Sequence, residues 1–157
     1  MTIKPGDRLP EVTLQRIRDG VENVDTRALF DHTKVVIFAV PGAFTPTCSE
    51  KHLPGFVQQF DAFRDKGVEV ACVSVNDPFV MSAWNERDGS EHITMLADGN
   101  GEFAEALGLT MDGSKFGMGK RSQRYSMVVN DGVVEQLNVE EPGAFNVSSA
   151  DYMLERL

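Results

Sequence analysis

Cysteine, positive charge and long apolar runs are all scarce in this sequence, and each scarcity excludes a class of protein. Only two cysteines occur in 157 residues, too few for a disulfide framework. The net charge of −9 disfavours a nucleic-acid or anionic-membrane partner. No apolar run approaches the roughly 20 residues of a membrane-spanning helix, and the amino terminus lacks the apolar segment of a secretory signal. We therefore expect one soluble, cytoplasmic domain over residues 1–157.

Apolar runs alternate with helical segments along the chain. The continuous apolar run at 35–40 predicts a strand that is covered on both faces, and the mostly apolar segment 68–75 predicts a second strand. Between them we expect a helix over 45–66, broken at Pro54 and ended by Gly67. Further expected elements are a helix at 78–86, a strand at 93–96, a helix at 102–107, a hairpin of strands 125–129 and 133–139, and a last helix from Ser148 or Ser149 to Leu157. This order predicts an α/β fold with a mixed sheet whose first two strong strands are parallel.

The segment that follows the first strong strand carries the main chemical signal. It joins the end of a buried strand to the start of a helix, where open α/β sheets place their ligands. The helix can begin in two ways: Thr47 with Glu50 forms a capping box, or Thr45 is the N-cap with Pro46 as the first helical residue. Both alternatives place Cys48 in the first turn.

A cysteine in that turn is a candidate nucleophile. Free backbone N–H groups and the helix dipole favour an anion there, and helix N-termini and nearby cations favour the thiolate over the thiol. We predict that Cys48 is a reactive, solvent-reachable thiolate. The alternative is a small buried apolar residue, a common fate of free cysteine.

Several segments together resemble the peroxiredoxins. The pattern Pro41-x-x-x-Thr45-x-x-Cys48 matches their signature, and the run PGAFTPTCSEKHLPGF is similar to the atypical branch of plant type-II and peroxiredoxin-five proteins. The segments VACVSVND, RYSMVVNDG and GAFNVSSADYML resemble that branch in the same order. The resemblance spans nearly the whole chain. It implies a thioredoxin-like fold with a mixed central sheet flanked by helices, thiol-dependent reduction of hydrogen peroxide and alkyl hydroperoxides without a cofactor, and a homodimer.

The resemblance also implies a role for particular residues. Cys48 corresponds to the peroxidatic nucleophile, Thr45 to the hydroxyl that orients peroxide and thiolate, Pro41 to a shield against water, and Arg124 to the active-site arginine. Attack on an O–O bond moves negative charge from sulfur to the departing oxygen. A guanidinium and the backbone N–H groups of Thr47 and Cys48, the expected substrate-binding groups, can stabilise that charge more than the starting peroxide.

Other residues compete for these roles. On residue type alone, Arg121 is as good a candidate for the active-site cation. His52 lies four residues after the reactive cysteine and could form a Cys–His pair on one helix face. No acyl-transfer motif accompanies it, so we expect a structural role near the active-site loop. His32 and His92 are expected at the surface, and the histidines and cysteines show no metal-ligand spacing.

The second cysteine decides how the catalytic cycle closes. Peroxide leaves Cys48 as a sulfenic acid, which another thiol must reduce. The stretch 143–149, where some members of the branch carry a resolving cysteine, has none. Cys72 is expected about 13 Å below the active-site end of its strand, at ~3.3 Å per residue, whereas a disulfide needs Cα atoms within ~7 Å. We therefore expect Cys72 in the core and an external reductant. Similarity to the plant type-II proteins suggests glutathione with glutaredoxin, and thioredoxin second.

Two further functions share parts of this chemistry. A non-catalytic peroxide sensor would pass oxidation from Cys48 to a partner through a mixed disulfide. A disulfide reductase would need a Cys-x-x-Cys pair, and Ser, Glu and Lys follow Cys48 instead. Separately, Phe116 and Met118 in the glycine-rich stretch 113–119 could line a mouth for alkyl hydroperoxides or belong to an ordinary loop.

Overall fold

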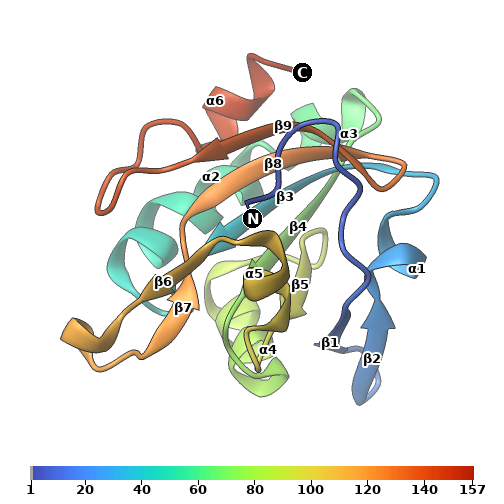
Figure 1. Cartoon of the computed structure of the whole chain (residues 1–157). Helices are drawn as coiled ribbons and strands as arrows, with labels where there is room; N and C mark the ends of the chain where they lie inside the picture. Colours follow the sequence, from blue (N-terminus) through green and yellow to red (C-terminus); the bar gives the residue numbers. More distant parts are fainter. Residues whose placement is uncertain (1) are drawn as a thin grey trace.

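A seven-stranded mixed sheet forms the centre of the structure, a computed structural model that describes residues 2–157 (Figure 1). The strand order is β2-β1-β5-β4-β3-β8-β9. The strands are β1 (Thr13–Ile17), β2 (Val21–Asp25), β3 (Lys34–Val40), β4 (Glu69–Ser74), β5 (Thr94–Ala97), β8 (Tyr125–Asn130) and β9 (Val133–Val139). β3 runs parallel to β4 and antiparallel to β8. The predicted mixed sheet and the parallel pairing of the first two strong strands are confirmed.

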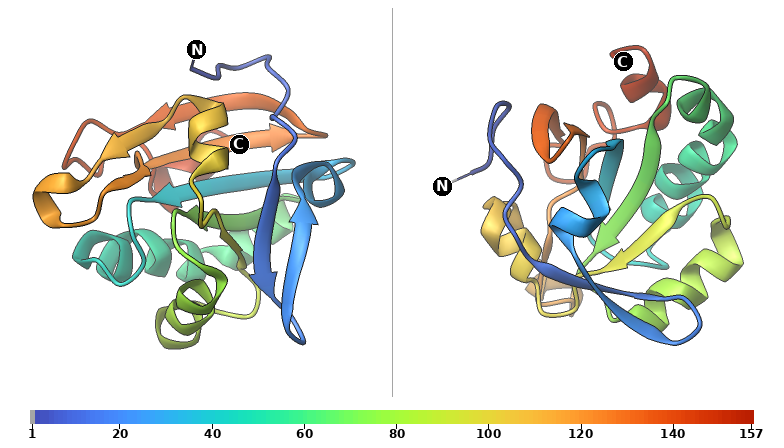
Figure 2. Two further views of the ribbon diagram at one scale, coloured as in Figure 1. Left: turned by 60° about the horizontal axis from the view of Figure 1, so that its bottom comes forward. Right: turned by 90° about the vertical axis from the view of Figure 1, so that its right-hand side faces the viewer.

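Helices cover both faces of this sheet (Figure 2). They are α1 (Thr26–Phe30), α2 (Leu53–Gln58), α3 (Phe60–Asp65), α4 (Pro78–Asp88), α5 (Glu102–Leu107) and α6 (Ala150–Leu154). The residues of β3 alternate between two apolar clusters, one on each face: Val36 packs with Phe56 and Trp84 of α2 and α4, and Ile37 with Phe103 of α5. Burial on both faces explains why β3 is a continuous apolar run. This arrangement is the expected thioredoxin-like fold. No helix in residues 2–157 has the length and apolar character needed to cross a bilayer.

The helix that follows β3 is irregular at a different place from the one predicted. Instead of breaking at Pro54, the helix widens into a π turn at Cys48–His52 and breaks only at Gln59. Pro54 has no N–H, and its ring would clash with the carbonyl four residues earlier in a regular helix. The wider turn, in which the N–H of Leu53 donates to the carbonyl of Cys48, lets the helix continue past the proline.

Most other predicted elements are present, with shifted ends. Gly67 ends α3 with φ +73°, as expected, while α6 ends at Leu154 and is capped by Ser149. The pattern missed α1, the β1–β2 hairpin and a second hairpin, β6 (Thr110–Asp112) and β7 (Lys120–Ser122), with a short helix at Ser114–Phe116 between its strands. In β1 and β2 only Leu14 and Val24 are buried, so these two strands contain no apolar run to reveal them.

Candidate active site

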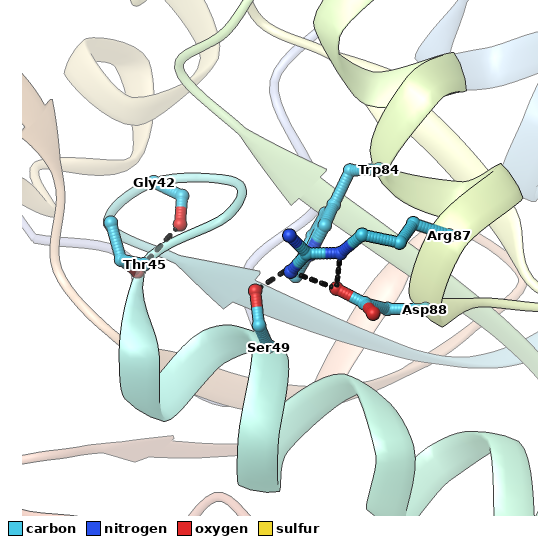
Figure 3. Close-up of polar contacts among 6 residues, drawn as sticks. All are labelled: Gly42, Thr45, Ser49, Trp84, Arg87 and Asp88. Carbon is cyan, nitrogen blue, oxygen red and sulfur yellow. Dashed lines mark hydrogen bonds and ion pairs between the residues drawn. The ribbon is translucent and has the colours of Figure 1, made fainter.

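The loop after β3 sets the start of the helix that carries Cys48. The carbonyl of Thr45 accepts a hydrogen bond from the N–H of Ser49 at 2.9 Å, and Thr47 makes no side-chain cap. Thr45 is therefore the N-cap, with Pro46 as the first helical residue, and the capping-box alternative is wrong. The Thr45 hydroxyl donates to the carbonyl of Gly42 at 2.7 Å, which closes the loop on itself (Figure 3).

Cys48 lies against an arginine, as the resemblance implies. Nη2 of Arg124 donates to Sγ of Cys48 at 3.0 Å. The sheet register explains the contact: Tyr125 pairs with Ala39 near the carboxyl end of β3, so the preceding residue lies beside the loop that follows. The Cys48 side chain is 0% exposed, and the expectation that it is solvent-reachable is wrong for this conformation. A cationic donor on the sulfur still distinguishes it from an apolar core residue.

Arg121 has a different task. Its Nε donates to the carbonyl of Met118 at 2.8 Å and its Nη1 to the carbonyl of Val75 at 2.7 Å. The first bond lies within the β6–β7 hairpin, and the second attaches the hairpin to the chain just after β4. The structure therefore selects Arg124, and not Arg121, as the cation at the cysteine.

His52 connects the active-site arginine to the carboxy-terminal loop. Its Nε2 lies 2.9 Å from the carbonyl oxygen of Ser148, and its Nδ1 lies 2.8 Å from Nη1 of Arg124. A carbonyl only accepts, so Nε2 carries the proton and Nδ1 accepts from the guanidinium. Burial, followed by the charge of Arg124, lowers the pKa of His52 from 6.5 to about 3. The ring is neutral and its lone pair is occupied by Arg124, which confirms a structural position and excludes a Cys–His base.

The lowered pKa makes stability depend on pH. Because the folded state disfavours the protonated ring, the stabilisation is complete above pH 6.5 and is lost progressively as the pH falls towards about 3. We expect the free energy of unfolding of the wild type to fall by up to ~1.4 kcal/mol per pH unit below 6.5, relative to His52→Gln. Urea titrations between pH 6.5 and about 5, above the range where carboxylates titrate, measure the difference. Parallel curves for the two proteins would contradict the buried neutral histidine.

The second cysteine lies in the core, as predicted. Cys72 pairs with Phe38 in the centre of the sheet and is fully buried, and both cysteines are free. Burial, followed by the nearby Cys48, raises the pKa of Cys72 well above its usual value, so its thiol is a poor nucleophile. Within residues 2–157, no group of three or more His, Cys, Asp or Glu side chains is placed to hold a metal ion.

A second set of contacts attaches the cysteine turn to α4. The indole N–H of Trp84 donates to the Ser49 hydroxyl at 3.0 Å, and the guanidinium of Arg87 donates to Asp88 (Figure 3). The same guanidinium lies 4.7 Å from the ring centroid of Phe44. No local pattern indicates these partners, because Ser49 and Trp84 are 35 residues apart. Only the packing of α4 beside the active-site helix brings them together.

A cysteine in the first turn after a central strand, held by an arginine on a thioredoxin-like sheet, defines a thiol-based redox protein. Comparison with known proteins gives the particular class. The model of the Redoxin family matches residues 4–154. The chain belongs to the Redoxin family, and its relatives there are peroxiredoxins.

Individual relatives cover almost the whole chain. Peroxiredoxin-2E, chloroplastic, of Arabidopsis thaliana is 48% identical over 99% of this chain and 70% of its own length. The crystal structure of reduced Prx3 from Vibrio vulnificus in complex with hydrogen peroxide has a TM-score of 0.95 and 51% identity, and covers 99% of this chain and 96% of that one. The Plasmodium falciparum antioxidant protein, named a 1-Cys peroxiredoxin, has a TM-score of 0.93 and 26% identity over 98% of both chains. The protein is a thiol-dependent peroxidase, as predicted.

Proposed function

We propose that this peroxiredoxin reduces hydrogen peroxide and alkyl hydroperoxides in a one-cysteine cycle, and that glutathione with glutaredoxin returns Cys48 to its reduced form. The observation that carries the assignment is the 3.0 Å contact between the guanidinium of Arg124 and the sulfur of Cys48. It places a permanent positive charge at the atom where the reaction begins.

The neighbouring groups suit the peroxide step. The Cys48 thiolate attacks one peroxide oxygen, the S–O bond forms as the O–O bond breaks, and the departing oxygen takes a proton and leaves as water or an alcohol. Arg124 and the N–H groups of Thr47 and Cys48 stabilise the charge as it moves to that oxygen. The Thr45 hydroxyl already donates to Gly42, so its lone pairs can accept from the peroxide O–H. The sulfur is buried, and Pro41 and Thr45 in the loop before it are half-buried.

The burial of Cys72 supports an external reductant. Cys72 is fully buried in the middle of a central strand and its thiol has a raised pKa, so it is poorly suited to attack a sulfenic acid. The 1-Cys name of the Plasmodium relative points in the same direction. The resemblance to the plant type-II peroxiredoxins suggests glutathione with glutaredoxin as the donor, and thioredoxin second.

Replacing the buried cysteine tests the cycle. We expect Cys72→Ser to consume peroxide over many turnovers at a rate within about threefold of the wild type, since the thiol takes no part in the chemistry. Consumption is measured with glutathione plus glutaredoxin and, separately, with thioredoxin and its reductase. Loss of turnover in a folded Cys72→Ser protein would make Cys72 the resolving cysteine. Oxidation that stops after one equivalent with both donors would instead indicate the peroxide sensor.

We also propose a homodimer, as the resemblance implies. Among the exposed large apolar side chains are Phe44 in the active-site loop, at 39%, and Phe79 at the start of α4, at 65%, and a subunit contact would cover both. A solution mass of one subunit would contradict this.

Phe116, 78% exposed between β6 and β7, is available to contact an alkyl hydroperoxide. The cytoplasmic location stays a prediction, since the Arabidopsis relative is named chloroplastic.

A further inference from the structure

A buried carboxylate, Glu140, organises the loop beyond β9. Its side chain accepts hydrogen bonds from the backbone N–H groups of Asn146, Val147 and Ser148 at 2.8 to 2.9 Å, and from the Ser148 hydroxyl at 2.6 Å. The residue is 7% exposed. Burial by itself raises the pKa of Glu140, but the hydrogen bonds from Ser148, Asn146 and Val147 outweigh it and lower the pKa, so the carboxylate stays charged. Four donors on one side chain fix the path of the loop.

That loop reaches the active site through the carbonyl of Ser148. The carbonyl accepts from Nε2 of His52 at 2.9 Å and from the hydroxyl of Ser126 at 2.6 Å. His52 in turn accepts from Arg124, whose other terminal nitrogen donates to Cys48. A series of hydrogen bonds, joined through the backbone of Ser148, therefore leads from the carboxylate to the sulfur.

A second contact between the loop and the site reinforces the first. The Phe145 ring packs edge-on against His52, with centroids 5.1 Å apart, and lies 5.9 Å from the guanidinium of Arg124. The backbone N–H of Glu140 also donates to the carbonyl of Arg124 at 2.9 Å. Glu140 thus contacts the backbone of Arg124 directly, and through the loop it is connected to His52, the side-chain partner of Arg124.

We propose that Glu140 is a positioning residue of the peroxidase site, which holds the Ser148 carbonyl so that His52 presents an unprotonated Nδ1 to Arg124 and so aims the guanidinium at Cys48. This inference rests on the proposed role of Arg124 at the cysteine. Its physical basis is the tautomer of His52. With the Ser148 carbonyl in place, the ring proton resides on Nε2. Without that carbonyl, the proton can move to Nδ1 of His52. Two N–H donors then face each other, and their repulsion displaces the guanidinium of Arg124.

Substitutions at two adjacent glutamates separate this role from a general effect of lost charge. Glu140→Ala removes every acceptor for the loop. Glu140→Gln keeps one oxygen, which can replace the carboxylate oxygen that receives all four donors. Glu141→Ala, at the exposed neighbouring position, is the matched control. The rate of Cys48 oxidation by hydrogen peroxide in a single turnover and the 15N NMR signals of the His52 imidazole are measured for each protein.

We expect Glu140→Ala to slow oxidation by about tenfold or more, because a displaced catalytic group loses its alignment. The same variant should change the His52 signals from those of a ring protonated at Nε2. Glu140→Gln should restore most of the rate and the wild-type signals, and Glu141→Ala should match the wild type. If Glu140→Ala does not fold, Glu140→Asp replaces it, since the shorter side chain withdraws the carboxylate from the loop amides.

Two results would overturn the proposal. One is a folded variant with a wild-type rate. The other is a slower rate with unchanged His52 signals, which would reduce Glu140 to a structural residue. The NMR measurement needs no peroxide, so it tests the placement of His52 even if wild-type activity failed to support the proposed function.

Discussion

Cys48→Ser is expected to reduce peroxide consumption to the uncatalysed background, a loss of at least about 10³-fold. Serine has nearly the same shape, and its hydroxyl can still accept the hydrogen bond that Arg124 donates to the sulfur at 3.0 Å. The hydroxyl remains protonated at neutral pH, however, and oxygen attacks peroxide far less readily than a thiolate does. The site would therefore keep its geometry and lose its nucleophile. Consumption of hydrogen peroxide with glutathione and glutaredoxin measures the effect.

The other cysteine provides the matched control for this substitution. Cys48 and Cys72 belong to the same apolar cluster and both are fully buried, so a serine at either position has a similar effect on packing. Only the first contacts a cation. Equal losses in the two serine variants, with both proteins folded by circular dichroism, would show that the decrease comes from damage to the core. Activity of Cys48→Ser within tenfold of the wild type would refute Cys48 as the nucleophile.

Arg124→Ala should produce the next largest effect, a decrease of about 10²–10³-fold in the rate of Cys48 oxidation. The guanidinium contacts the sulfur through one terminal nitrogen and His52 through the other, so its removal eliminates the charge and leaves Nδ1 of His52 without its donor. Arg124→Lys keeps the charge but has a single nitrogen, which cannot reproduce the two bonds that the planar guanidinium makes to Cys48 and His52. We expect it to fall between alanine and the wild type. Stopped-flow oxidation by hydrogen peroxide measures all three proteins.

Arg121→Lys is the control for the arginine prediction. Arg121 comes from the same segment of the chain, but its bonds go to the carbonyls of Met118 and Val75. Its replacement should change the oxidation rate by less than about threefold, in keeping with a residue outside the reacting atoms. A larger effect at Arg121 than at Arg124 would reverse their assignment and remove the observation on which the proposed function depends.

Several parts of the molecule follow from local sequence. The apolar runs that became β3 and β4 appear in the sequence because a strand buried on both faces needs apolar residues at every position. Gly67 was recognisable as the end of α3, and Asp131-Gly132 as the tight turn between β8 and β9, because a positive φ favours such residues at both sites. The polar turn around Cys48 also marked a reactive cysteine locally, because the free N–H groups at the start of a helix belong to residues next to it in the sequence.

The rest of the site was decided by the tertiary structure. Arg124 lies 76 positions from Cys48, and Ser148 lies 96 positions from His52. Local sequence contains no record of such pairs. The antiparallel register of β8 on β3 places Arg124, and not Arg121, at the sulfur, and the loop beyond β9 brings Glu140 into the same network. The sequence alone determined which residue could act as the nucleophile. The resemblance pointed to Arg124 as the charge beside it, but no local pattern explains that choice. The pairing of distant strands does, because the free energy of such contacts depends on distances that exist only in the folded chain.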